Sequence, residues 1–157
     1  MAVDDGPQPI KMIVGDSFRA VGDFAPIRFA KWAIGNDAPL VVSPQHRMLI
    51  TGWQAELYFG QDEILVAAKH LVNGDTIRQV TGGRVQCIHL LFDAHQIFFA
   101  QSVPSESYFP GHTLTASDEA TRSEVQMLFP QLINDKAEVW QAVRPVLKGF
   151  EAVLMAV

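Results

Sequence analysis

Ser43 and His46 are the residues of this sequence whose types and spacing best suit chemistry on a peptide bond. They stand in the stretch SPQH, between the apolar segments Leu40–Val42 and Arg47–Ile50. A hydroxyl and an imidazole in one turn between two strands can both point at one peptide bond. Such a pair could polarise a carbonyl and protonate a leaving amide nitrogen. A Ser-Pro turn before a histidine that starts a strand accounts for the same four residues, so spacing alone leaves both interpretations open.

The other histidines, His70, His89, His95 and His112, are further candidates for proton exchange near neutral pH. Their spacing fits no familiar zinc site, because the sequence has neither a His-Glu-x-x-His motif nor a cysteine pair. The sequence also lacks a Gly-x-Ser-x-Gly elbow, a Walker loop and a Gly-x-Gly-x-x-Gly motif. We therefore expect no metal and no cofactor, and find no support for an α/β-hydrolase or a nucleotide-binding protein.

Composition limits the classes of protein further. The 157 residues suffice for one domain, and 48% hydrophobic with 18% charged residues is typical of a chain that folds. The net charge is −5 with scattered Lys and Arg, so we expect no nucleic-acid surface. We expect no membrane partner, because no apolar stretch approaches the roughly 20 residues that span a bilayer.

The first residues do not resemble a secretory signal, which leaves the localisation open. Cys87, the single cysteine, excludes an internal disulfide and is interpreted as a small core residue within a strand.

Short strands are predicted from about residue 9 to residue 102. Segments rich in β-branched and aromatic residues alternate with Gly, Pro, Asn and Asp at intervals of about 8 to 12 residues, as in sandwiches and barrels. The expected strands are Ile10–Val14, Phe18–Val21, Pro26–Ala30, Leu40–Val42, Arg47–Ile50, Ala55–Phe59, Ile64–Ala67, Thr76–Val80, Arg84–Phe92 and Gln96–Gln101. Helical turns are expected at Lys31–Gly35 and Ala68–Val72. The predicted fold class is mainly β.

The pattern changes to a helical one after residue 110. Ser117 can cap a helix that runs to about Leu128, and apolar residues recur at helical spacing from Asp135 onward, with a break at Pro145. We therefore expect a β domain over residues 1–112 and a helical C-terminal tail over residues 113–157 that packs on it.

Several motifs occur together in the order and at the spacing of a known family. They are Gly6-Pro7-Gln8-Pro9-Ile10, Ser43-Pro44-Gln45-His46-Arg47, the stretch AKHLVNGD at 68–75, and HLLFDAH at 89–95 followed by Pro104-Ser105-Glu106-Ser107. In this combination the sequence resembles the bacterial branch of the Hedgehog/intein (Hint) domain family. The resemblance covers roughly residues 5 to 112, and the helical tail is also similar to the segment that comes after the domain in that branch.

This resemblance implies a β horseshoe whose substrate is its own polypeptide chain. In the family an N-terminal cysteine or serine attacks the preceding carbonyl, and the resulting thioester or ester is then resolved by another nucleophile. By resemblance, Ser43 and His46 are the pair that strains and protonates the scissile amide. His95 matches a second histidine that assists the later step.

Two departures from the family pattern qualify this expectation. The family's opening segment, which carries the nucleophile, precedes the equivalent of Gly6, and Cys87 lies too late in the chain to replace it. Splicing inteins end in His-Asn, where this sequence has PSES at residues 104–107. We therefore expect an N-terminally incomplete domain that is inactive as an isolated chain. Its parent would cleave or transfer rather than splice.

Two other functions stay open at this point. The chain could be a non-catalytic Hint-like interaction module that pairs through exposed strand edges, and could then form a homo-oligomer. It could also be an unrelated hydrolase that uses Ser105 or Ser107 with His95.

Overall fold

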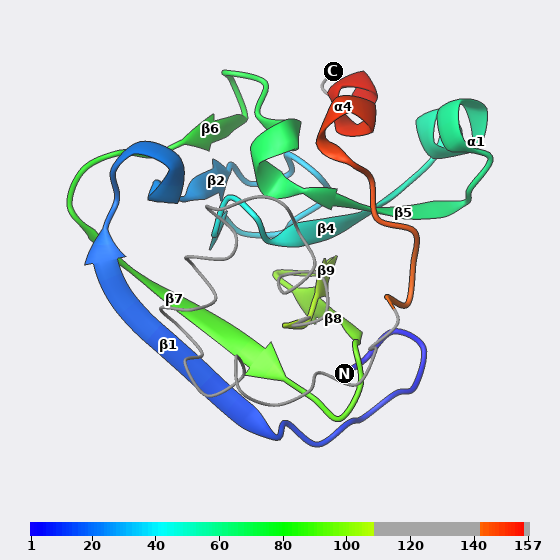
Figure 1. Cartoon of the computed structure of the whole chain (residues 1–157), viewed down its shortest axis with the longest axis horizontal. Helices are drawn as coiled ribbons and strands as arrows, with labels where there is room; N and C mark the ends of the chain where they lie inside the picture. Colours follow the sequence, from blue (N-terminus) through cyan, green and yellow to red (C-terminus); the bar gives the residue numbers. More distant parts are fainter. Residues whose placement is uncertain (109–141, 156–157) are drawn as a thin grey trace.

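The computed structural model describes residues 1–108 and 142–155, and its strands form three antiparallel sheets (Figure 1). The fold class is mainly β, which confirms the prediction. The strands are β1 (Met12–Arg19), β2 (Ile27–Phe29), β3 (Leu40–Val42), β4 (Arg47–Thr51), β5 (Glu63–Ala67), β6 (Ile77–Gln79), β7 (Arg84–Leu91), β8 (Ile97–Ala100) and β9 (Val103–Glu106). The helical elements are η1 (Gly22–Phe24), α1 (Trp53–Phe59), η2 (Ala68–Leu71), α4 (Gly149–Ala152) and η4 (Val153–Met155).

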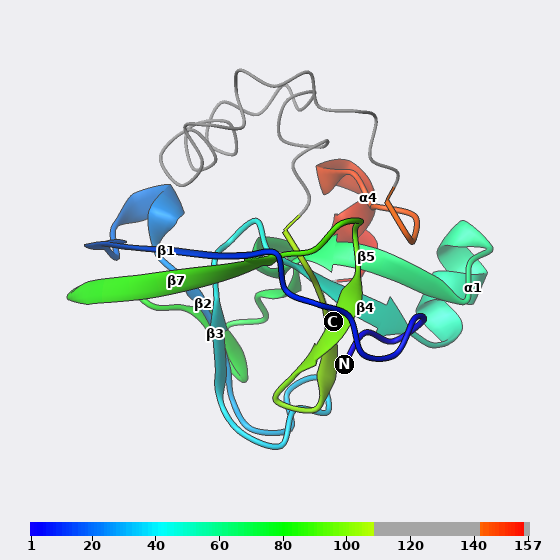
Figure 2. The same ribbon diagram turned by 90° about the horizontal axis from the view of Figure 1, so that it is seen from below.

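Strands β1 and β7 form a long two-stranded ribbon along one side of the molecule (Figures 1 and 2). The sequence predicts two strands where β1 is one, because glycine and aspartate, here Gly15-Asp16, usually interrupt a strand. Gly15 instead lies within the ladder opposite Ile88, and a Cβ at this position would lie 2.9 Å from the backbone oxygen of Cys87. Glycine here permits the close approach of the two strands.

The main core lies between the sheet β3-β2-β6 and one face of the sheet β5-β4-β9-β8. Because side chains alternate along a strand, Met48, Ile64 and Val66 share that face. Their buried partners include Ile27 and Phe29 of β2. The β4 strand therefore starts at the edge of a well-packed core, and this fixes the position of the residue just before it, His46.

The opposite face of the same sheet is covered by the C-terminal segment. Leu49, Leu65 and Ile97 pack there against Val143 and Val146. Backbone hydrogen bonds hold the segment on β5: the Leu65 N–H donates to the Pro145 carbonyl (2.8 Å), and the Leu147 N–H donates to the Leu65 carbonyl (3.0 Å).

The predicted long helix from Asp135 is wrong over the part that the structure describes. Residues 142–148 are not helical, and only the short α4 and η4 come after them, with α4 beside η2 (Figure 1). Phe150, expected on the apolar stripe, is 75% exposed. Pro145 is compatible with this break, since proline cannot continue a helix. The predicted helix at Ser117–Leu128 lies outside the described residues.

Two further elements differ from the sequence prediction. Residues 55–59 belong to helix α1 and not to a strand: Ala55 is fully buried and Phe59 packs on the core, a helical spacing of four, and Gly60 ends the helix with a left-handed backbone (φ 62°). Strand β9 was not predicted, since proline is unusual inside a sheet and Pro104 is its second residue.

The expected helical turn at Lys31–Gly35 is a turn without a helix. Asn36, fully buried, organises it: the Ile34 N–H donates to its Oδ1 atom, and its Nδ2 atom donates to the carbonyls of Ala30 and Ala38. The turn at Ala68–Val72 is confirmed as the 3-10 helix η2.

Candidate active site

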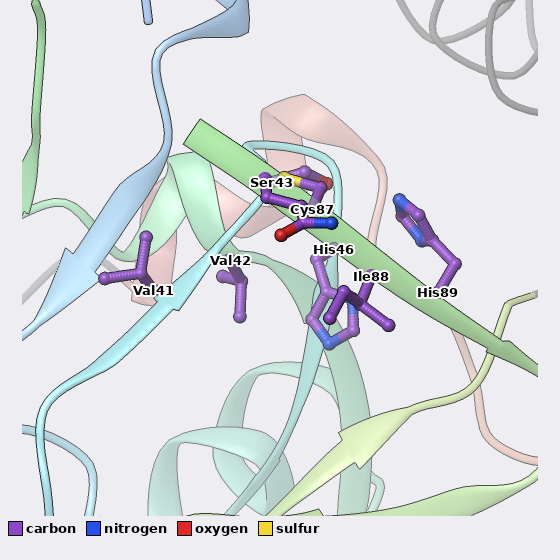
Figure 3. Close-up of a pocket in the computed structure, with 8 residues that line it drawn as sticks. Val41, Val42, Ser43, His46, Cys87, Ile88 and His89 are labelled. Carbon is purple, nitrogen blue, oxygen red and sulfur yellow. The ribbon is translucent and has the colours of Figure 1, made fainter. Parts of the chain in front are cut away.

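A cavity of about 210 Å³ lies between the end of β3 and the middle of β7 (Figure 3). One wall is formed by Val41, Val42, Ser43 and His46, and the other by Gln86, Cys87, Ile88 and His89. The first wall is the β3–β4 turn, which contains the SPQH motif. Strands β3 and β4 belong to separate sheets, and the cavity lies beside the turn that joins them.

The turn is held in place by its own backbone and by η2. The His46 N–H donates to the Ser43 carbonyl (3.2 Å), and the Lys69 N–H donates to the Pro44 carbonyl (3.0 Å). The His46 carbonyl accepts the Ala68 N–H (2.8 Å). Because three backbone bonds fix the turn, the Ser43 and His46 side chains are presented to the cavity from a rigid support.

The polar atoms of these two side chains differ in their partners. Ser43 is 5% exposed, and its hydroxyl makes no hydrogen bond within the described part of the chain. His46 is half-buried; its Nε2 atom lies 2.5 Å from the Oγ atom of Ser105, while its Nδ1 atom has no partner among the described residues. One hydroxyl and one imidazole nitrogen are therefore available to a group that enters the cavity.

A second polar cluster lies on the other face of β4 and β9. The Arg47 N–H donates to Glu106 Oε1 (2.8 Å), and the Arg47 guanidinium donates to Glu106 Oε2 (3.1 Å). His95 Nε2 lies 3.6 Å from the same Oε2 atom, and His95 Nδ1 accepts the Val143 N–H (3.2 Å). Alternation along each strand explains the division: Ser105 faces His46, and the next residue, Glu106, faces Arg47 and His95.

Burial and neighbouring charges set the ionisation of these groups. Burial lowers the pKa of His46 below its ordinary value of 6.5, the negative charge of Glu106 opposes this, and the positive charge of Arg47 adds to it. Burial also lowers the pKa of His89 to about 4, helped by the nearby His46 and opposed by Glu106. Both cavity imidazoles are therefore neutral at pH 7.

Glu106 is a buried carboxylate, 6% exposed. Burial raises its pKa, but the charge of Arg47, the hydrogen bond from His95 and the charges of both histidines outweigh burial, and the pKa falls to about 2. Glu106 is therefore negatively charged at neutral pH, on the face of the sheet opposite Ser105 and His46.

The structure brings Ser43 and His46 together, but it does not place His95 among the residues that line the cavity. His95, 1% exposed, lies in the Glu106 cluster, and the neighbouring residues Ser105 and Glu106 of β9 lie between it and His46: Ser105 contacts His46 and Glu106 contacts His95. The interpretation of Cys87 as a core residue is wrong, because the residue is half-buried and lines the cavity. Among the described strands, β7 belongs to the two-stranded sheet with β1 and not to a larger sheet that packs into the core.

Sequence reasoning missed Ser105, Glu106 and Arg47 as parts of the site. As a reacting group, Ser105 was considered only as a hydrolase nucleophile beside His95, whereas its hydroxyl faces His46. The available signal was the polar stretch PSES after an apolar strand, but its partners lie 59 residues earlier in the sequence.

No group of three or more His, Cys, Asp and Glu residues in the described part of the chain is arranged to hold a metal ion. No helix within residues 1–108 and 142–155 has the length and apolar character needed to cross a membrane.

The fold and the site define a class of mainly β domain that presents a serine and a histidine from one turn to a cavity between two strands. The chain belongs to the Hint domain family, whose family model matches residues 1–112. No curated protein and no solved structure matches the chain.

Proposed function

We propose that this chain is a self-processing domain that cleaves a peptide bond of its own polypeptide by an acyl shift. The observation that carries the proposal is the free Nδ1 atom of His46 beside the unbonded Ser43 hydroxyl in one cavity of the described part of the chain. Membership of the Hint family, which includes self-processing domains, supports the same chemistry.

Each group has a defined task in this proposal. A hydroxyl or thiol of the processed segment attacks the carbonyl before it, so that a C–O or C–S bond forms and the C–N bond breaks. The neutral His46 accepts the proton of the attacking group at Nδ1 and returns it to the leaving amide nitrogen. The Ser43 hydroxyl hydrogen-bonds the scissile amide and holds it against the imidazole.

His95 has a different position in the mechanism. Its Nδ1 atom is occupied by the Val143 N–H and its Nε2 atom faces Glu106. We therefore assign His95 to the later step, in which the ester or thioester is resolved, and this step requires the Val143 contact to open.

The test is processing of the chain expressed in its natural reading frame together with the sequence that flanks it there. Intact-mass measurement over time should show a defined cut in the wild-type protein and an uncut precursor for His46→Ala. His70→Ala is the matched control, since His70 lies on η2 and does not line the cavity. An uncut wild-type precursor, or a His46→Ala variant cut at the normal rate, would rule the proposal out.

The β1–β7 ribbon favours a second candidate function, a module that pairs with a second copy of the chain. Ile13 and Ile88 are 63% and 61% exposed, and the ladder register puts both on one face of the ribbon. Exposed apolar strands of this kind favour association. Light scattering after size exclusion should then give a dimer that Ile13→Lys converts to a monomer, while a wild-type monomer at every concentration contradicts pairing.

A further inference from the structure

Ser105 joins the cavity histidine to the core of the sheet. The residue is fully buried on β9, opposite Met48 of β4. Its Oγ atom lies 2.5 Å from His46 Nε2 and 3.8 Å from the Met48 sulfur. Because His46 precedes Met48 by two residues, strand alternation brings both side chains to the same side of Ser105.

The single proton of the Ser105 hydroxyl can serve only one of these two neighbours. If the hydroxyl donates to His46 Nε2, the ring proton is on Nδ1 and the Met48 sulfur accepts nothing from Ser105. If the hydroxyl donates to the Met48 sulfur, Oγ accepts the Nε2–H of His46, and both contacts are hydrogen bonds. The second arrangement uses every contact that the geometry offers.

We propose that Ser105, through its bond to the Met48 sulfur, is a positioning residue that keeps the His46 proton on Nε2 and the Nδ1 lone pair directed at the cavity. The bond made by one ring nitrogen of a histidine decides the state of the other. In the reverse tautomer Nδ1 already carries a proton and cannot accept the proton of an attacking group.

This inference rests on the proposed function for its catalytic meaning, since a free Nδ1 atom is the state that can take a proton from an attacking group. The tautomer itself is a property of the folded chain. It can therefore be measured whether or not the protein cleaves itself.

The test is long-range ¹H–¹⁵N NMR of the histidine-labelled full chain at pH 7.5, where His46 is neutral. We expect the wild-type His46 signals to show a protonated Nε2 and an unprotonated Nδ1. Met48→Leu keeps the volume of the core but removes the sulfur. The Ser105 proton then turns to Nε2, and the His46 proton moves to Nδ1. Ser105→Ala should give a mixture of both tautomers, because Nε2 loses its partner.

Ser107→Ala is the matched control. It removes a second buried hydroxyl two residues further along the chain, which accepts the Gln96 N–H (2.9 Å) and should leave the His46 signals unchanged. A wild-type Nδ1 that carries the proton, or a Met48→Leu protein with the wild-type pattern, overturns the inference. If Ser105→Ala fails to fold, Met48→Leu decides.

A second readout links the tautomer to processing. In a precursor that cleaves itself, Met48→Leu should slow the cut by about a hundredfold, the lower end of what acid-base catalysis supplies. A normal cleavage rate in a variant whose tautomer has switched refutes the positioning role. A wild-type precursor that does not cleave refutes the proposed function alone, because the NMR result still decides the tautomer.

Discussion

Glu106→Gln is the substitution whose effect on stability can be worked out most fully from the structure. The carboxylate accepts two hydrogen bonds from Arg47 and lies beside His95, and it is 6% exposed. Its pKa falls from 4.5 to about 2 on folding. A difference of about 2.5 pH units, at roughly 1.4 kcal/mol for each, corresponds to about 3 kcal/mol of folding free energy.

The sign of the pH dependence is set by the direction of this change. Because the pKa of Glu106 is lower in the folded protein, its stabilising contribution is complete above pH 4.5. It is lost as the pH falls from 4.5 towards 2. Glutamine keeps the shape but not the charge, and it leaves the half-buried Arg47 without its counter-charge. We therefore expect the free energy of unfolding at pH 7 to fall by about 2 to 4 kcal/mol.

Urea unfolding of wild-type and Glu106→Gln proteins, measured between pH 7 and pH 2, tests both expectations. Asp93→Asn is the control, since Asp93 pairs with Lys11 at an exposed site and its loss should change stability by about 0.5 kcal/mol or less. A Glu106→Gln protein within about 1 kcal/mol of wild type, with the same acid sensitivity below pH 4.5, would refute the reasoning.

Two other buried polar groups should each affect stability in a measurable way. Asn36→Ala should reduce the free energy of unfolding by about 2 to 4 kcal/mol in urea titrations, since it removes the partner of the Ile34 N–H and of the Ala38 carbonyl, while the Ala30 carbonyl keeps the Ala33 N–H; an effect below about 1 kcal/mol contradicts this role. His89, whose pKa falls from 6.5 to about 4 on folding, should make the protein less stable as the pH drops through this range, because the unfolded chain binds a proton that the folded chain does not. His89→Gln should flatten the dependence of the melting temperature on pH between 6.5 and 4, and an unchanged slope would show that His89 does not cause it.

The sequence predicted strands well where apolar residues form a short run that becomes buried in a sheet. Leu40–Val42 was predicted with its observed bounds, and β4 and β5 to within one residue. Helix α1 was missed because it lies largely in solvent: Trp53 and Leu57 are 62% and 68% exposed, so the segment has no helical apolar stripe to detect. Only Ala55 and Phe59 carry the helical spacing, and glycines at both ends mark its limits.

The candidate site combines contacts between residues close in sequence with contacts between residues far apart in sequence. Ser43 and His46 share one turn, so their proximity can be inferred from the sequence alone. The contact of His46 with Ser105 depends on the pairing of β4 with β9, and β9 contains a proline at its second position. Strand pairing across 59 residues has no local signature, and therefore neither Ser105 nor Glu106 could be assigned to His46 or Arg47 from spacing.

Because of the pairing of β4 with β9, His46 and His95 have different hydrogen-bond partners, and this difference can be tested at His95. Both imidazoles lie beside β9, but the Nδ1 atom of His95 is already bonded to the Val143 N–H, whereas that of His46 is free within the described residues. Val143→Pro removes the N–H, so His95 should become several-fold more reactive towards diethyl pyrocarbonate, as measured by peptide mass. Val143→Ala keeps the N–H and also loses the packing of Val143, and it should leave His95 protected. Equal modification of His95 in both variants would mean that packing, and not the hydrogen bond, shields the ring. Greater reactivity in Val143→Pro alone would mean that the Val143 N–H, and not packing, keeps the His95 ring from reacting.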